Sequence, residues 1–238
     1  MVDVHDAPRY AIYYSPAADQ RLTQMAARWL GRDAFTGRVV SRDDVSDDVH
    51  ALVIEPRRYG FHATLKAPFR LAEGFAVGDL ERALGEFAEE CAPCALGRLK
   101  LDVLGDFFAL RPAQPVPTLL DFAGRIVETF DRFRAPLSQT EMKRRLSGSL
   151  DDTETSNVMR WGYPYVFDRY RFHMTLTGHI APDLRPSLLR RLEQTFDPLL
   201  EEDYSVDALA LFAQTGSDGD FVVRSWYPLG NRATNLRD

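Results

Sequence analysis

The sequence predicts an α+β protein in which helices pack on antiparallel sheets. β-prone runs alternate along the chain with amphipathic stretches of helical period. Hairpin signals occur in each half, as a Gly-Asp turn at 105–106 and a glycine-rich turn at 215–219. The order strand, helix, strand, helix, strands in the first half returns less completely in the second half. Together these observations indicate an α+β architecture with a repeated plan.

The first half of the chain carries this order in full. Residues 10–14 are a β-prone run that stops at Ser15-Pro16, and a helix is predicted from about 18 to 30, ending at Gly31. The elements expected after it are an exposed acidic loop at 41–50, a strand at about 59–69, a helix at 77–91, and strands at 99–104 and 107–110.

Three prolines within residues 111–117 predict a stiff connector to the second half. The elements expected beyond it are a helix at 118–133, a polar and mostly helix-prone segment at 137–162, a strand at about 170–180, a helix at 184–200, and strands at 205–213 and 220–227. The chain is therefore expected to form a single bilobal domain over 1–238, with a first lobe at about 9–110 and a second lobe at about 118–238.

Composition places the chain among ordinary globular proteins. It has 238 residues, of which 45% are hydrophobic and 27% charged, which excludes a disordered or fibrous chain. A formal net charge of -6 argues against a broad basic surface for extended duplex nucleic acid, but it is compatible with a small phosphorylated ligand in a locally basic cleft. The chain has no run of eighteen apolar residues and no signal-peptide core, so we expect a soluble, cytoplasmic protein without a membrane partner.

One heptapeptide recurs about half a chain apart. Residues 59–65 read YGFHATL and residues 170–176 read YRFHMTL, which makes five of seven positions identical. Alternate side chains of a strand face opposite ways, so one face would carry a histidine and a threonine in each copy. These residues are His62 and Thr64 in the first copy and His173 and Thr175 in the second. Two such strands side by side would surround one cleft with two histidines and two threonines.

Phosphoester cleavage is the chemistry that uses this set of side chains. A general base takes the proton of the attacking oxygen while a general acid protonates the leaving oxygen, and histidine suits both roles because its ordinary pKa lies near neutrality. Hydroxyl groups beside the histidines can donate hydrogen bonds to the phosphoryl oxygens, where negative charge sits during displacement. This mechanism requires no metal or other cofactor.

The paired tetrads at 62–65 (HATL) and 173–176 (HMTL) resemble the signature of the two-histidine (2H) phosphoesterase superfamily. The helix and strands after each tetrad fit this resemblance, and segment 224–230 is similar to the superfamily's closing strand. The resemblance implies a bilobal fold, with two similar antiparallel-sheet lobes and flanking helices around a central cleft. It also implies a metal-independent phosphoric diester hydrolase. The catalytic residues that it implies are His62, Thr64, His173 and Thr175.

A narrower resemblance rests on residues 59–69 (YGFHATLKAPF) and 161–165 (WGYPY), which look like the branch encoded in bacterial phosphonate-utilisation operons. It implies a role near carbon–phosphorus bond metabolism, where cyclic ribose phosphates occur as intermediates. Residues 137–165 look like an insertion that the RNA-ligase-like members of the superfamily lack. RNA ends are therefore the less favoured substrate.

Three further residues are candidates for substrate binding. Lys66 and Arg171 extend the proposed cleft face of their strands and could touch phosphate, although either could instead end a strand in solvent. Tyr163 could stack on a base or sugar, or simply pack a loop. The basic run at 143–145 is either a solvated helix face or part of a lid over a phosphorylated substrate.

No metal site is predicted. His173 and His179 have an even offset on one predicted strand, but six strand residues span about 20 Å, which is too far for one ion to bridge. Cys91 and Cys94 form an isolated C-x-x-C near the end of a predicted helix, which disfavours zinc binding and redox chemistry.

The sequence therefore predicts an enzyme that hydrolyses a phosphodiester, with a small cyclic ribose-type phosphate as the favoured substrate. One alternative is an RNA-end 2′,3′-cyclic phosphodiesterase or ligase-like enzyme, which would need an extended basic track with exposed aromatic side chains. The other is a non-catalytic module that binds a sugar phosphate or nucleotide, which is less favoured because all four motif residues are present.

Overall fold

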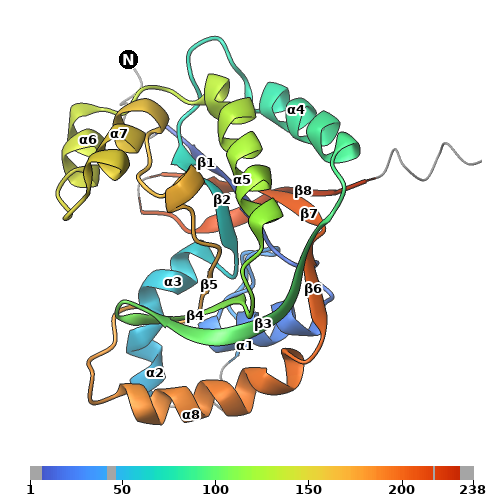
Figure 1. Ribbon diagram of the computed structural model, residues 1–238, viewed down its shortest axis with the longest axis vertical. Coiled ribbons are helices and arrows are strands. Elements are labelled where there is room, and N and C mark those ends of the chain that lie inside the picture. Colours follow the sequence, from blue (N-terminus) through green and yellow to red (C-terminus); the bar gives the residue numbers. More distant parts are fainter. Residues whose placement is uncertain (1–6, 42–46, 217, 231–238) are drawn as a thin grey trace, which may run out of the picture.

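The expected α+β class is confirmed. The computed structural model describes residues 7–41, 47–216 and 218–230. In these residues eight strands form one sheet in the order β6-β3-β4-β5-β2-β1-β7-β8, and each pair of neighbours is antiparallel (Figure 1). The strands are β1 Arg9–Tyr14, β2 Ala63–Phe69, β3 Cys94–Leu104, β4 Phe107–Pro112, β5 Met174–Thr175, β6 Asp203–Val206, β7 Ala208–Gln214 and β8 Phe221–Pro228.

Helices cover the sheet in two groups. Figure 1 shows α4 and α5 near β8 and β2, and α1, α2 and α8 at the opposite end of the molecule, beyond β3. The apolar faces of α1, α4, α5 and α8 are buried in a core that they share with the sheet. The helices are α1 Arg21–Leu30, α2 Asp47–Leu52, α3 Ile54–Tyr59, α4 Val77–Glu90, α5 Pro117–Phe130, α6 Gln139–Arg145, α7 Asp152–Trp161 and α8 Arg185–Phe196.

The two halves of the chain share the sheet. Strands β1 to β4 come from the first half and β5 to β8 from the second, yet β5 lies between β4 and β2, and β6 lies beside β3. Each half of the sheet thus combines strands from both segments, 9–110 and 118–238. This interleaving is what brings the two copies of the heptapeptide next to each other.

The sheet is strongly curved. Strand β6 forms one edge and β7 lies next to the other edge, yet only Asp207 separates the two strands in the chain. Because consecutive Cα atoms lie about 3.8 Å apart, the facing ends of β6 and β7 are within about 8 Å of each other. The two edges of the sheet therefore approach each other, and the sheet curls into an open half-barrel.

Both motif strands are shorter than the expected 59–69 and 170–180. Helix α3 extends to Tyr59, because Pro56 lies in its first turn, where the missing N–H costs nothing. Gly60 then ends the helix with a φ of 73°, so β2 begins only after the histidine. In the second copy the strand is reduced to Met174–Thr175.

Other elements differ from expectation in smaller ways. The single strand expected at 205–213 is two strands, because the chain leaves β6 at one edge of the sheet after Val206 and enters β7, which pairs near the opposite edge. Strand β3 starts at Cys94, ahead of the expected residue 99. Half of the expected loop at 41–50 lies outside the described residues, and its last four positions belong to helix α2 instead. No helix in the described part of the chain is long and apolar enough to cross a membrane.

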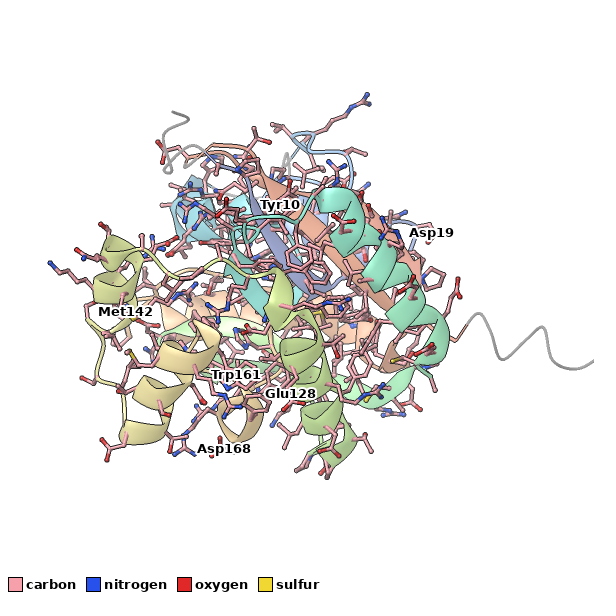
Figure 2. All side chains as sticks on the ribbon, turned by 90° about the horizontal axis from the view of Figure 1, so that it is seen from above. Tyr10, Asp19, Glu128, Met142, Trp161 and Asp168 are labelled. Atoms are coloured by element: carbon pink, nitrogen blue, oxygen red, sulfur yellow. The ribbon has the colours of Figure 1, made fainter. Side chains whose placement is uncertain are left out.

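Residues 137–165 form the helical pair α6 and α7. Capping boxes begin both helices, with Ser138 and Glu141 in α6 and Asp151 and Glu154 in α7. An ion pair between Arg70 and Glu141 ties α6 to the end of β2. Figure 2 shows Met142 of α6 at the left of the molecule and Trp161, at the end of α7, nearer the centre beside α5, where Glu128 is labelled.

Candidate active site

The two histidine–threonine pairs meet at one point of the sheet. Ala63 of β2 is the direct antiparallel partner of Met174 of β5, and both side chains are fully buried. One residue further along this register, His62 lies opposite Thr175, and on the other side Thr64 lies opposite His173. Because neighbours in a strand point to opposite faces, the four polar side chains share the face that Ala63 and Met174 turn away from.

All four side chains line a single cavity of about 900 Å³. Other parts of its wall come from β1, α3, the end of α6 and the segment after α7, and include Arg9, Tyr13, Tyr59, Arg144, Arg145 and Tyr163. A second cavity of about 520 Å³ adjoins it, shares Thr64, Tyr163 and His173, and adds Tyr165 and Arg171. The pair forms a groove that is large enough for a phosphorylated sugar. This is the arrangement that the resemblance to the two-histidine phosphoesterases implies, with two motif strands side by side around one cleft.

The His62 ring is held in a fixed orientation. Its Nδ1 lies 2.9 Å from the Gly60 carbonyl oxygen, and since a carbonyl can only accept, Nδ1 carries the proton. In the neutral ring Nε2 is then an acceptor, and the Thr64 hydroxyl lies 3.3 Å from it. The Tyr13 ring stacks on the imidazole at a centroid distance of 3.8 Å.

The pKa of His62 is lowered to about 4, mainly by burial and in smaller part by the nearby charge of His173, against the opposing effect of the hydrogen bond to the Gly60 carbonyl. His62 is therefore neutral at pH 7 in the free protein. Both imidazoles line the same cavity, so one ligand can contact both of them.

His173 repeats this arrangement. Its Nδ1 lies 2.7 Å from the carbonyl oxygen of Arg171, which is two positions earlier in the chain. His62 bonds Gly60 with the same spacing. Nε2 is again the nitrogen left for chemistry. Burial lowers the pKa of His173, and the charge of Arg111 adds to this effect. Phe107 packs against the ring at a centroid distance of 5.8 Å.

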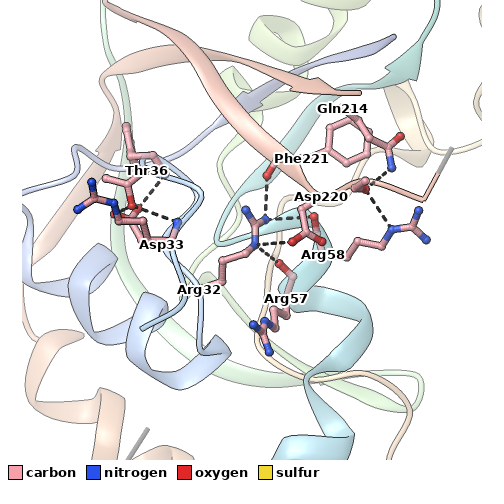
Figure 3. Close-up of polar contacts among 11 residues, drawn as sticks. Arg32, Asp33, Thr36, Arg57, Arg58, Gln214, Asp220 and Phe221 are labelled. Atoms are coloured by element: carbon pink, nitrogen blue, oxygen red, sulfur yellow. Dashed lines mark hydrogen bonds and ion pairs between the residues drawn. The ribbon is translucent and has the colours of Figure 1, made fainter. Parts of the chain in front are cut away.

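The backbone before His62 is held by the buried Arg32 (Figure 3). The Arg32 guanidinium donates hydrogen bonds to the carbonyls of Arg57 and Arg58 at 2.9 and 3.1 Å, and to that of Phe221 at 2.8 Å. It thereby joins the last turn of α3 to β8. Gly60 follows at once, and a Cβ on this glycine would lie 2.5 Å from the Cβ of Ala34. The sequence contains no signal that distinguishes Arg32 from its other arginines.

Lys66 does not line the cavity, contrary to the expectation from strand alternation. Its ammonium group donates to the Asp131 carboxylate at 3.0 Å and to the Val127 carbonyl at 3.1 Å, and the side chain is only 4% exposed. A register shift in the pairing of β1 with β2, between Thr64 and Lys66, breaks the alternation that the sequence suggested. Lys66 instead links β2 to α5 and the turn that follows it.

The other two candidates for substrate binding lie at the groove. Arg171 is exposed and lines the second cavity, while its carbonyl oxygen orients His173. Tyr163 lines both cavities and packs edge-on against Tyr165, with ring centroids 5.5 Å apart. The Arg145 guanidinium lies over the Tyr163 ring, 5.0 Å from its centroid.

Sequence reasoning missed part of the cavity wall. Tyr13 lies in the run at 10–14 that predicts only a strand, Arg9 lies just before that run, and no motif marks either residue, yet both line the cavity from β1. The sequence leaves open whether the basic run at 143–145 is a solvated helix face or part of a lid. In the structure Arg144 and Arg145 line the cavity, whereas Lys143 is exposed outside it. Among the described residues no group of three or more His, Cys, Asp or Glu side chains is placed to hold a metal ion.

Comparison with solved structures finds proteins of similar extent. A crystal structure of a phosphoesterase aligns over 94% of this chain and 98% of its own, with 14% identity and a TM-score of 0.41. Usb1 of Kluyveromyces marxianus aligns over 95% of this chain and 100% of its own, with 14% identity and a TM-score of 0.36.

Two similar curated proteins are named ribose 1,5-bisphosphate phosphokinase PhnN. The protein of Janthinobacterium sp. (strain Marseille) is 34% identical over 222 residues, and that of Laribacter hongkongensis (strain HLHK9) is 36% identical over 214 residues. Each match covers 90% of this chain but only 49% and 50% of the relatives, so the chain spans about half their length. The family model described as "Protein of unknown function (DUF1045)" matches residues 64–222, which is more than half of the chain. The protein therefore belongs to the DUF1045 family.

Proposed function

We propose that the protein is a metal-independent phosphoesterase that hydrolyses a small cyclic ribose-type phosphate, with His62 and His173 as general base and general acid. The pairing of Ala63 with Met174 carries this proposal, because it sets each histidine opposite the threonine of the other tetrad on the wall of one cavity. Such a site can contact a phosphodiester from two sides.

The proton inventory of the two rings fits this reaction. Each Nδ1 donates to a backbone carbonyl, so each Nε2 is the nitrogen that exchanges protons in the cavity. One Nε2 accepts a proton from water as its oxygen bonds to phosphorus, and the other gives a proton to the ribose oxygen as its bond to phosphorus breaks. The products are a phosphomonoester and a free hydroxyl. Thr64 and Thr175 donate hydrogen bonds to the phosphoryl oxygens.

The lowered pKa values keep both histidines neutral in the free protein, and binding of the anionic substrate should raise these pKa values. Burial keeps both rings neutral near pH 7, which provides the base. The acid must be protonated, and the negative charge of the bound phosphodiester favours the imidazolium form. The negative charge of the substrate thus stabilises the protonated histidine that its cleavage requires.

The kinase name of the two relatives is compatible with this proposal. The chain matches only about half of each relative, and none of its glycines is followed by lysine, as a phosphate-binding P-loop requires. We assign the named kinase activity to the other half of those proteins. An enzyme that acts on ribose 1,5-bisphosphate, joined to a cyclic ribose phosphate hydrolase, fits two steps on one ribose phosphate and the place in phosphonate metabolism that the sequence resemblance implies.

The test is the release of phosphomonoester from ribose cyclic phosphates, nucleoside 2′,3′-cyclic phosphates and short RNAs carrying a cyclic end, in excess EDTA. We expect turnover of the ribose cyclic phosphates that is lost in His62→Ala and His173→Ala. Activity that disappears in EDTA and returns with one divalent ion contradicts the mechanism. Exclusive cleavage of RNA ends contradicts the substrate, and tight binding of every cyclic phosphate without cleavage indicates a binding module.

A further inference from the structure

Three arginines from distant parts of the chain converge on the cavity that holds the histidines. Arg9 comes from β1, and Arg144 and Arg145 come from the end of α6. Their guanidinium groups are near enough to influence one another: burial lowers the pKa of Arg9 and of Arg145, and the charge of Arg144 lowers both further. Three like charges gathered in one wall repel one another, so their arrangement favours an anion between them.

The protein itself does little to neutralise this arginine cluster. Arg9 donates from Nε to the neutral amide oxygen of Gln214 at 2.7 Å, and Arg145 lies over Tyr163. The Arg145 Nε is buried and has no hydrogen-bond partner. Within the described ranges, no carboxylate forms an ion pair with Arg9, Arg144 or Arg145. The positive charge of the three guanidinium groups is therefore not offset by a paired carboxylate, which favours an anion beside them.

The described acidic side chains near the cluster form no ion pair with it. Glu141 lies beside Arg9 and Arg144 and its charge acts on Arg145, but its carboxylate is paired with Arg70. Asp106 binds His179, and Asp218 lies 3.9 Å from Arg58. Glu55 lies in the first turn of α3 and forms no ion pair with an arginine of the cluster. The positive charge of the arginine cluster is therefore available to a ligand.

The arginine cluster is separate from the histidine pair. Tyr13 of β1 stacks on the His62 ring and pairs with Thr64. Arg9 lies four residues earlier on the same strand, about 13 Å away along it, where β1 runs beside the far end of β2. The cluster is thus placed to hold a second anionic group of the ligand rather than the phosphorus that reacts.

We propose that Arg9, Arg144 and Arg145 form a subsite for a second phosphate, a phosphomonoester that the substrate carries in addition to its cyclic phosphodiester. This inference rests on the proposed function and specifies its substrate as a phosphorylated sugar cyclic phosphate, whose hydrolysis yields a sugar bisphosphate. Guanidinium forks suit the oxygens of a phosphomonoester, which they bind in pairs. Tyr163 lies between the cluster and the second cavity, where its ring can pack on the sugar.

The anchoring of α6 supports a preformed subsite. The capping box of Ser138 and Glu141 fixes the start of the helix, and the pairing of Glu141 with Arg70 ties it to β2. The cluster is therefore positioned before a ligand arrives, which reduces the entropy lost on binding. It also gives a role to the insertion at 137–165, which brings Arg144 and Arg145 to the site.

The test compares a ribose cyclic phosphate with and without a phosphate on its 5-hydroxyl. We expect the wild-type kcat/KM to be about 100-fold higher for the phosphorylated substrate, because charged hydrogen bonds contribute strongly. Arg144→Gln and Arg145→Gln should each lower this ratio about 10-fold, mainly through KM. Arg145→Lys, which keeps the charge but loses the fork, should lower it less. Lys143→Gln removes a charge from the same helix outside the cavity and should leave the ratio unchanged.

The outcomes separate the subsite from the proposed function. Equal wild-type kcat/KM values for both substrates, with ratios that the arginine variants do not alter, overturn the subsite and leave the hydrolase intact. If neither substrate is cleaved, the proposed function fails, and calorimetry with the same two ligands on His62→Ala still decides the subsite. Tighter binding of the phosphorylated ligand that Arg144→Gln weakens supports it, and equal affinity overturns it.

Discussion

Ala63 lies directly opposite Met174 in antiparallel register, and the candidate site is built around this pair. Both side chains are buried in the core, and the residues on either side of them face the cavity. The result is a local two-fold symmetry, in which each histidine lies across from the threonine of the other tetrad. The same symmetry explains why the repeated motif alone does not distinguish the base from the acid.

The two histidines should behave as one functional unit. His62→Ala and His173→Ala are each expected to reduce turnover by several orders of magnitude, and the double variant should lose little more than the worse single variant, because neither proton transfer works without the other. Rates of the purified variants on the best cyclic phosphate measure this. The wild-type rate should follow a bell-shaped pH profile that belongs to the pair. Losses that simply multiply would show that the histidines act independently.

The threonines should affect turnover more than stability. Thr64→Val and Thr175→Val are expected to fold normally and to lose roughly 10- to 1,000-fold in kcat, the range for one removed donor to a developing charge. Thr195→Val is the matched control, because this threonine lies on α8 and bonds only its own helix, at the Arg191 carbonyl. Full turnover in either motif variant returns that threonine to an ordinary strand residue.

The sequence was sufficient to predict the fold class and the four motif positions, because both depend on local patterns. A repeated Phe-His-x-Thr-Leu needs only strand alternation to place a histidine and a threonine on one face. The curvature of the sheet was not predictable in this way. It depends on the chain crossing from β6 to β7 at Asp207, and a polar residue between two apolar runs gives no indication of which strands will pair.

The remaining cavity residues depend on features that have no sequence pattern. The prediction that Lys66 lines the cavity was wrong because a single register shift in β2 turns its side chain to the opposite face of the sheet. Such bulges have no reliable sequence pattern in a short strand. Arg9 and Arg145 are more than 130 positions apart and meet only through the placement of α6 beside β1. Arg32 bonds backbone carbonyl groups, which every residue has, so no side-chain pattern in the sequence indicates its partners.

Burial of His62 should make stability depend on pH. Its pKa falls from an ordinary 6.5 to about 4 in the folded state, so the unfolded chain binds the proton more readily. This contribution to stability is fully present above pH 6.5 and is lost as the pH falls from 6.5 to 4, by at most about 3 kcal/mol. Urea denaturation at several pH values should show a smaller loss in His62→Gln than in wild type. Parallel curves for the two proteins would contradict a buried, neutral His62.

Gly60 should be required for both stability and activity. Its φ of 73° and ψ of -179° lie in a region that is essentially restricted to glycine, and a Cβ would lie 2.5 Å from the Cβ of Ala34. Gly60→Ala must therefore shift the backbone whose carbonyl orients His62. Gly74 provides the matched control, because it has a φ of 88° but no atom within 4 Å of the point that a Cβ would occupy.

Urea denaturation and turnover of both glycine variants separate conformational strain from misplacement of the histidine. Gly74→Ala should cost about 1–2 kcal/mol, the penalty for a side chain in the left-handed region, and should leave kcat unchanged. Gly60→Ala carries a backbone penalty of the same kind and adds the contact with Ala34, so it should destabilise the protein more than Gly74→Ala does. It should also lower kcat by about 100-fold, since a small displacement of a catalytic group has effects of that size. A stable Gly60→Ala variant with full turnover would show that the Gly60 carbonyl does not position His62.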